Sequence, residues 1–408
     1  MLPEDPRWRQ LLADPEAAAT LLADPAARAE FVAAAAALQA EHDDLVLLHD
    51  STLEHANEIE EQLAVKIEQV EALVVELELR NAFIRQVFGR HVTDEVVNTL
   101  LASPEGRQLG GERRTLTILI SDLRGFSTLC EGLGPEQVVA ILNIYLGAMA
   151  DVIGEYRGSI NEFIGDAILA VFGAPVPQED HPERAVACAI AMQRAMGRVN
   201  ADLAEHGLPA LEMGIGVHTG EVVVGNIGSN RRAKYGVVGR HVNLTSRIES
   251  YTVGGQVLIS GSAAEALGDR LHTRGSFEVR PKGVREPITI HDVTGVDGPF
   301  AIHMAEETSQ WRVLAEPQRL SFTALEGKDT GGQEIPAVLV AHDELHNAEL
   351  HVTTVVPLRS DLKLVLAALP GVDAYAKVVA STAGRVVVRF TALPRALTEL
   401  LEGLPLRT

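Results

Sequence analysis

The chain has 408 residues, of which 46% are hydrophobic and 22% are charged, and its formal net charge at pH 7 is −21. This length allows two or three domains with sizeable cores, and the composition excludes a largely disordered protein. The acidic balance argues against nucleic acid or an anionic membrane surface as a partner, because both attract a basic face.

Two further features favour a cytoplasmic protein. The chain has only two cysteines, too few for a disulfide framework. Its first residues lack a signal-peptide pattern, and no apolar run approaches the length of a membrane span, so we expect no membrane insertion.

Residues 1–40 are rich in alanine and contain the near-repeats LLADPEA and LLADPAA. Each Asp-Pro pair favours the start of a helix, with Asp as the N-cap and Pro in the first turn. We therefore expect a short helical segment here, without visible chemistry.

Residues 41–88 are expected to form a coiled coil. The stretch contains neither Pro nor Gly, and Leu63, Val70, Leu77 and Ile84 recur every seven residues. The alternative is a single amphipathic helix that packs on a globular core.

Residues 112–296 alternate strand-like and helix-like stretches. The strand-like ones are TLTILIS, SINEFI, AILAVFG and LEMGIGVHTGEVVVGNIG, and the helix-like ones cover 135–153, 183–205 and 241–251. The order β-α-β-β-α-β indicates a ferredoxin-like antiparallel sheet with helices on one face, so the fold class is α+β.

Residues 297–318 are expected to be a linker, and residues 319–408 a small β-barrel domain. The barrel prediction depends on short strand-like segments followed by a helix from about residue 394. These segments are 335–341, 347–355, 361–367, 374–381 and 384–391.

Two acidic residues stand where apolar strands meet turns. Asp122 follows TILIS, and Asp166 lies in the turn between SINEFI and AILAVFG. Carboxylates at neighbouring strand ends form a hard-oxygen site that suits Mg²⁺ or Mn²⁺. The backbone N–H groups of Gly125, Phe126 and Ser127 could hold phosphate oxygens. Taken alone, each Asp is more often a turn or cap residue.

The stretch HVNLTSRIE places Asn243 and Arg247 four residues apart, and therefore on one helical face. An Arg held there could stabilise charge on a phosphoryl transition state, with Asn positioning a sugar. The alternative is an Asn near the start of a helix and a solvated Arg.

Four segments resemble, in order, the successive motifs of class III adenylate and guanylate cyclases: ILISDLRGFS, FIGDAILAVFG, GVHTGEVVVGNIGS and GVVGRHVNLTSRIE. The resemblance implies a lyase that makes a cyclic nucleotide for signal transduction. QVFGRHVTDEVVNTLL resembles the helical transducer that precedes many bacterial cyclase domains, and we place such a transducer at 89–111.

The resemblance implies that Asp122 and Asp166 bind two Mg²⁺ or Mn²⁺ ions per active site, with the Leu123 carbonyl as a further ligand. In that family the metal residues come from one subunit, and the Asn and Arg residues come from its partner. The resemblance thus implies a homodimer, whose formation the coiled coil would favour.

The remaining roles follow from the same resemblance. Asn243 would orient the ribose, and Arg247 would stabilise the transition state. Lys282, in RPKGVREP, matches a lysine that contacts the terminal phosphates.

Glu162 stands where adenylate cyclases of this class usually have Lys and guanylate cyclases usually have Glu. Guanine presents N1–H and N2–H₂ donors, which a carboxylate accepts, whereas adenine has an unprotonated N1. Gly236, at the second base-reading position, offers no side chain. The alternative is that Glu162 forms an ion pair with Lys234 and does not select the base.

We therefore expect a nucleotide cyclase that converts GTP to 3′,5′-cyclic GMP and pyrophosphate, with adenylate cyclase activity on ATP as the alternative. A non-catalytic nucleotide-sensing module is a further alternative, which the intact set of candidate site residues disfavours. The C-terminal barrel faintly resembles a PilZ domain but lacks the paired arginines for cyclic di-GMP, so we expect a ligand-free interaction barrel. No segment identifies the upstream regulator.

Overall fold

A computed structural model describes residues 13–88, 109–229, 232–281, 283–284, 286–305, 310–325, 333–344 and 346–407. The chain divides into two compact units, residues 1–87 and residues 88–408. Each unit is described by itself.

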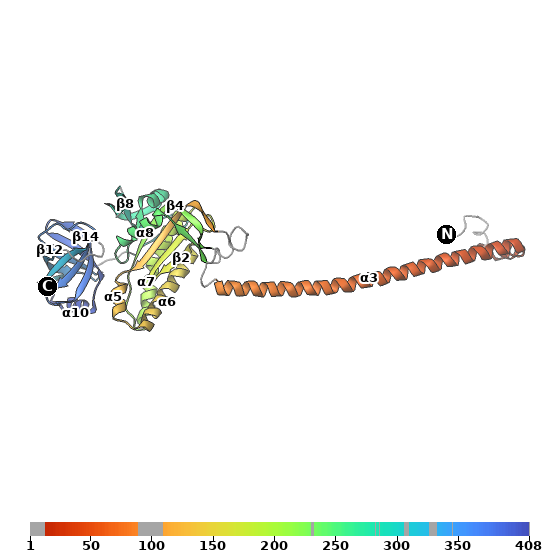
Figure 1. Ribbon diagram of the computed structural model, residues 1–408, viewed down its shortest axis with the longest axis horizontal. Coiled ribbons are helices and arrows are strands. Elements are labelled where there is room, and N and C mark those ends of the chain that lie inside the picture. Colours follow the sequence, from red (N-terminus) through yellow and green to blue (C-terminus); the bar gives the residue numbers. More distant parts are fainter. Residues whose placement is uncertain are drawn as a thin grey trace. The chain divides into compact units, whose positions relative to one another are not determined.

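The first unit is helical. α2 (Pro15–Leu21) begins as the Asp-Pro pattern predicts, because the Asp14 side chain accepts a hydrogen bond from the backbone N–H of Glu16. α3 (Pro25–Phe88) is a single helix of 64 residues (Figure 1). It continues through residue 40, where the sequence had suggested a division.

The heptad positions of α3 are exposed in the single chain. Ile59, Leu63, Val70, Leu73 and Leu77 are all more than half exposed. Such a row of apolar side chains is typical of a helix that pairs with another helix. The coiled coil remains a prediction.

The second unit contains a nine-stranded sheet in the order β2-β3-β1-β4-β6-β8-β7. Its first four strands are β2 (Ser159–Ile164), β3 (Ala167–Phe172), β1 (Gly110–Leu123) and β4 (Met213–Ser229). They pair antiparallel in the ferredoxin-like order, which confirms the predicted fold class.

Five strands extend this sheet: β5 (Arg232–Val238), β6 (Val257–Ser260), β7 (Leu271–Val279), β8 (Ile288–Val296) and β9 (Ile302–His303). β6 lies parallel to β4, whereas the other added strands pair antiparallel. The shorter helices of this domain are α5 (Phe126–Glu131), α8 (Arg240–Ser250), α9 (Gly261–Leu267) and the 3-10 turn η2 (Gly268–Arg270).

Two long helices, α6 (Pro135–Glu155) and α7 (His181–Glu205), cover one face of the sheet (Figure 1). Alternation along β1 separates two cores: Leu119 packs in the core with α6 and α7, whereas Ile118 and Ile120 pack on the other face. The strand ends are thereby fixed relative to both layers.

α6 is long and apolar enough to cross a membrane by length and composition, contrary to the expectation from the sequence that no stretch approaches this limit. In this fold the helix is amphipathic. Its residues Ile141, Tyr145, Met149 and Ile153 are fully buried against the sheet and α7. These contacts are those of a core helix.

The C-terminal barrel closes in the order β10-β11-β12-β15-β14-β13. Its elements are β10 (Arg312–Leu325), β11 (Ile335–His342), β12 (Asn347–Val352), β13 (Asp361–Leu366), β14 (Asp373–Thr382), β15 (Arg385–Ala392) and α10 (Arg395–Gly403).

The sequence had indicated five of these strands and assigned the start of β10 to the linker. Pro317 argues against a strand because it lacks an N–H for the ladder. The structure resolves this conflict with an irregularity in the β10–β11 register between Val313 and Gln318, which spans the proline.

Candidate active site

Asp122 and Asp166 lie at neighbouring ends of strands. β1 pairs antiparallel with β3 up to Ser121 opposite Ile168, so the end of β1 lies beside the turn that precedes β3. Gly165, with φ of 67°, makes that turn possible in two residues. The predicted pair of carboxylates is therefore brought together by the sheet.

The electrostatics of this pair favour a cation. Burial, against the opposing effect of Arg124 and with the charges of Glu249 and Asp166, raises the pKa of Asp122 to about 7. Two carboxylates in such a site repel each other when both are ionised. A divalent cation would relieve this repulsion, and carboxylate oxygens are the donors that Mg²⁺ and Mn²⁺ prefer.

Arg124 and Glu249 border the carboxylates, although the sequence analysis did not single out either residue. Arg124 Nη2 lies 2.9 Å from Asp122 Oδ2 and also donates to Glu249 Oε1. The Arg124 and Glu249 side chains are only 10% and 9% exposed. Burial raises the pKa of Glu249, while Arg124 opposes that shift. Together they form a buried charge network around the candidate metal site.

Leu123, whose carbonyl is a predicted further ligand, is the last residue of β1, and its side chain is buried. Gly125 then adopts φ of 66° at the N-cap of α5, and Phe126 anchors that helix in the core. Ser127 is exposed in the first turn. The loop has the predicted position, and its phosphate contact remains a prediction.

α8 presents different residues on its two faces. Thr245, Ile248 and Glu249 are buried, and Glu249 reaches Arg124 of the same chain. Asn243 is exposed, and the guanidinium of Arg247 lies beside Gly283, 3.5 Å from where a Cβ on that glycine would be. The helix thus directs Glu249 toward Arg124 and Asp122 of its own chain, and Asn243 and Arg247 elsewhere.

Glu162 and Lys234 form an ion pair, the arrangement that the sequence analysis held as the alternative to base reading. Lys234 Nζ lies 3.0 Å from Glu162 Oε1, and both side chains are about half exposed, at 48% and 49%. Such an exposed pair contributes little to stability, about 0.2–1 kcal/mol. The pair therefore leaves both side chains accessible to a ligand.

Asn161 is a candidate residue that sequence reasoning missed. The β2–β3 register shifts between Ile160 and Glu162, which leaves Asn161 as the extra residue of a bulge. Its Oδ1 atom lies 3.1 Å from where a Cβ on Gly236 would be. The Asn161 amide thus lies next to the base-reading position that Gly236 leaves without a side chain.

Two predicted features lie outside the described residues: Lys282, and residues 89–108, which include most of the predicted transducer. Their roles remain predictions.

The barrel, which belongs to the same compact unit, contacts residues next to this site. Lys377 Nζ lies 2.5 Å from the backbone oxygen of Ser250, at the end of α8. A Cβ on Gly125 would lie 2.7 Å from the backbone oxygen of Thr391, which leaves room only for glycine. The loop at Gly125 and the end of α8 are therefore both in contact with the barrel.

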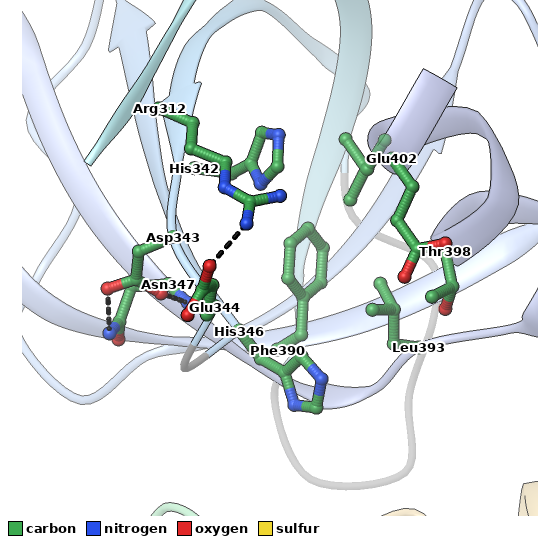
Figure 2. A pocket seen from close by; sticks show the side chains of 11 residues that line it. Arg312, His342, Asp343, Glu344, His346, Asn347, Phe390, Leu393, Thr398 and Glu402 are labelled. Atoms are coloured by element: carbon green, nitrogen blue, oxygen red, sulfur yellow. Dashed lines mark hydrogen bonds and ion pairs between the residues drawn. The ribbon is translucent and has the colours of Figure 1, made fainter. Parts of the chain in front are cut away.

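A separate cavity of about 200 Å³ lies in the barrel itself (Figure 2). Phe390 stands at its centre, with Arg312 on one wall and Thr398 and Glu402 of α10 on the other. Arg312 is ion-paired with Glu344 across the cavity wall. This arginine is thus engaged within the protein, and the ligand-free barrel remains a prediction.

Residues 111–294 match the family described as the Adenylate and Guanylate cyclase catalytic domain. Adenylate cyclase 1 of Rhizobium meliloti (strain 1021) is 32% identical over 211 residues, which are 51% of this chain and 32% of that protein. An uncharacterised protein of Mycobacterium tuberculosis is 32% identical over 53% of this chain and 39% of its own length. The chain thus spans about a third of the length of these curated relatives.

Two solved structures are also similar. The guanylyl cyclase Cya2 is 58% identical and is matched over 100% of its chain and 48% of this one, with a TM-score of 0.47. The adenylyl cyclase CyaB from P. aeruginosa is 34% identical over 100% of its chain and 48% of this one, with a TM-score of 0.45.

Residues 111–294 are a class III adenylate/guanylate cyclase domain, and the chain belongs to that family through this domain. Members of the class are lyases that make cyclic nucleotides and generally use divalent metal ions. The relatives include adenylyl as well as guanylyl cyclases, so membership alone does not determine the nucleotide.

Proposed function

We propose that the chain is a cytoplasmic guanylate cyclase, which converts GTP to 3′,5′-cyclic GMP and pyrophosphate in a homodimer with shared sites. The observation that carries the cyclase assignment is the pair Asp122 and Asp166, whose side chains interact at adjacent strand ends. This pair forms part of an intact set with Asn243 and Arg247, which disfavours a non-catalytic module.

Glu162 supports GTP as the substrate. A carboxylate accepts both hydrogen bonds from the N1–H and N2–H₂ edge of guanine. The Asn161 amide beside Gly236 presents its Oδ1 atom there, 3.1 Å from where a Cβ would be, with Nδ2 at 3.9 Å. Rotation of this amide would direct its N–H donor toward the guanine O6 atom, a contact that a bare glycine does not provide. Glu162 thus complements guanine better than adenine, and a rotated Asn161 amide would add to that preference.

The two faces of α8 support a site shared between two copies. Asn243 and Arg247 lie on the face away from Glu249, which reaches the metal carboxylates of its own chain through Arg124. A second copy could bring its Asn243 and Arg247 to these carboxylates. The exposed heptad positions of α3 provide a surface through which two copies would associate.

The roles of the residues follow from this arrangement. Asp122 and Asp166 would hold two Mg²⁺ or Mn²⁺ ions, which when bound lower the pKa of the 3′-hydroxyl and neutralise phosphate charge. Asn243 would orient the ribose for in-line attack on the α-phosphorus. Arg247 would stabilise the charge on the α-phosphoryl group, and Lys282 would stabilise the leaving pyrophosphate.

The ion pair between Glu162 and Lys234 favours a second candidate, an adenylate cyclase. If the pair persists when nucleotide binds, the carboxylate is partly satisfied by Lys234 and selects less strongly for guanine. The lysine ammonium could then donate to the unprotonated N1 of adenine.

A product assay with GTP and ATP side by side, in the presence of Mn²⁺ or Mg²⁺, tests the proposal. We expect cyclic GMP to be formed with the higher kcat/KM, and Asn161→Ala to reduce the preference for GTP. A preference for ATP would replace the first candidate by the second. The absence of product from either nucleotide, with a folded dimer, would contradict both.

A further inference from the structure

A second group of metal-binding side chains lies at the other edge of the cyclase sheet. It consists of His272 on β7, Asp297 just after β8 and His303 on β9. The strand order places β8 and β7 at one end of the sheet and β2 and β3 at the other. This group is therefore separate from Asp122 and Asp166.

The three side chains converge on one point. Asp297 Oδ2 lies 2.7 Å from His272 Nε2, and Asp297 Oδ1 lies 3.5 Å from His303 Nε2. One ligand atom from each residue lies within 4.8 Å of the other two. The two imidazole rings are 5.1 Å apart between centroids. Each side chain is about half exposed, so a solvated ion can reach all three.

The backbone holds these residues in place. Gly295 of β8 pairs with His272 on one side and with His303 on the other, so the two histidines flank a single glycine. A Cβ on Gly295 would lie 2.1 Å from Cδ2 of His303. The absence of a side chain at Gly295 is what lets the His303 ring turn toward Asp297.

The Asp297 and His303 positions are also fixed by backbone hydrogen bonds beside them. The N–H of Asp297 donates to the Arg270 oxygen at 2.9 Å, and the N–H of Met304 donates to the Thr294 oxygen at 2.7 Å. All three candidate ligands are therefore carried by paired backbone rather than by a loose loop.

We propose that His272, Asp297 and His303 bind one divalent transition-metal ion of the Zn²⁺ type. Two imidazole nitrogens and one carboxylate oxygen are ligands that such ions prefer, whereas Mg²⁺ prefers oxygen alone. Tetrahedral Zn²⁺ with ligand distances of about 2.0–2.2 Å requires donor atoms roughly 3.4 Å apart. The His303–Asp297 pair, at 3.5 Å, already has this spacing, and the His272–Asp297 pair, at 2.7 Å, would open by less than about 1 Å. Water completes the coordination.

The consequence of binding follows from the position of the three residues. The ion would join β7, β8 and the two-residue strand β9, which is the last strand before the chain continues toward β10. A strand this short has few backbone hydrogen bonds of its own. The metal site would fasten it to the sheet and stabilise the C-terminal border of the cyclase domain.

The test is a calorimetric titration of the full chain with Zn²⁺, with excess Mg²⁺ present to occupy the carboxylates Asp122 and Asp166. The wild type is compared with His303→Asn and with His272→Asn, so that one misfolded variant does not decide the result. His206→Asn is the matched control, because His206 is an exposed histidine of the same domain outside the cluster. Melting temperatures with and without Zn²⁺ are measured on the same samples.

We expect the wild type and His206→Asn to bind one Zn²⁺ ion at this site. Both cluster variants should bind that ion at least roughly tenfold more weakly. Zn²⁺ should raise the melting temperature of the wild type and of His206→Asn more than that of the cluster variants. Equal stoichiometry and affinity in all four proteins would overturn the proposal. The readout is binding, so the result is independent of the proposed cyclase activity.

Discussion

At one end of the candidate active site, Arg124 joins Asp122 to Glu249, and the Arg124 and Glu249 side chains are about 10% exposed. At the other end, Glu162 and Lys234 pair through side chains that are about half exposed. At the first end Arg124 and Glu249 are buried, so their charges act strongly on one another, and partial burial raises the pKa of Asp122, whose side chain is 36% exposed, to about 7. The second end is about half exposed to solvent.

We expect this difference in burial to correspond to different responses to substitution at the two ends of the site. A buried network resists change, because removal of one charge leaves the others uncompensated. An exposed pair tolerates exchange of its members at little cost in stability. We therefore expect substitutions at the metal end to affect turnover or folding, and substitutions at the base end to affect the choice of nucleotide.

The largest effect should come from the metal carboxylates. Asp122→Ala or Asp166→Ala should lower product formation by roughly three orders of magnitude or more, about 4 kcal/mol in the barrier. Asp166→Ala removes one of two repelling carboxylates and should leave the melting temperature unchanged or higher, whereas Asp122→Ala also removes a partner of Arg124 and should lower it. The control is Asp151→Ala, an exposed carboxylate on α6. Activity close to the wild type in either variant would refute the metal assignment.

The buried network should be the most sensitive part of the fold. Arg124→Met leaves Glu249 buried without its partner and should lower the free energy of unfolding by about 3 kcal/mol. Arg113→Met removes an exposed pair with Glu221, at 3.4 Å, and should cost less than about 1 kcal/mol. Denaturant unfolding of both variants measures the difference. Equal losses would show that burial does not distinguish the two arginines.

Glu162 and Lys234, at the second end of the site, should control which nucleotide is preferred as substrate. Glu162→Lys should lower the ratio of kcat/KM for GTP to that for ATP by roughly ten- to a hundredfold, because each lost or mismatched hydrogen bond to a charged group is worth about 1.5–3 kcal/mol. The double variant Glu162→Lys with Lys234→Glu restores the ion pair but not the guanine acceptor. If the double variant regains the wild-type ratio, the carboxylate acts only as a partner of Lys234.

The smallest expected effect is on the stability of the fold at acid pH, and it depends on His218 of β4. Burial, together with the neighbouring His241, lowers the pKa of His218 from 6.5 to about 4. His218 is 4% exposed, and its two nitrogens lie 2.7 Å from Ser260 Oγ and from His241 Nδ1. The folded chain keeps His218 neutral, whereas the unfolded chain takes up a proton below pH 6.5. Stability is therefore lost as the pH falls from 6.5 toward 4.

At pH 5 this loss should be about 2 kcal/mol relative to pH 8. His218→Gln should show a smaller loss, whereas the control His206→Gln, at an exposed site, should behave like the wild type. Denaturant unfolding of the three proteins at both pH values checks this. An identical pH dependence in wild type and His218→Gln would remove His218 as the cause.

The local pattern was sufficient to predict that Asp122 and Asp166 lie together, because Asp122 is near the end of an apolar strand and Asp166 is in the turn before the strand that pairs with it. Their metal-binding role remains a prediction. The partners Arg124 and Glu249 are 125 residues apart in the sequence, so their contact depends on the packing of α8 on the sheet. Asn161 depends on a bulge, which is a property of the register between two strands. β10 was missed because a proline in a strand is tolerated only where the register breaks.

The central claim is that one copy supplies the metal carboxylates and another supplies Arg247. The direct test mixes Asp166→Ala with Arg247→Ala, each inactive alone, under conditions in which subunits exchange. A mixed dimer has one site with both defects and one intact site, so activity should reappear on mixing. The activity of each mixed dimer should approach half that of a wild-type dimer. No recovery, when exchange has been demonstrated, would contradict the shared site.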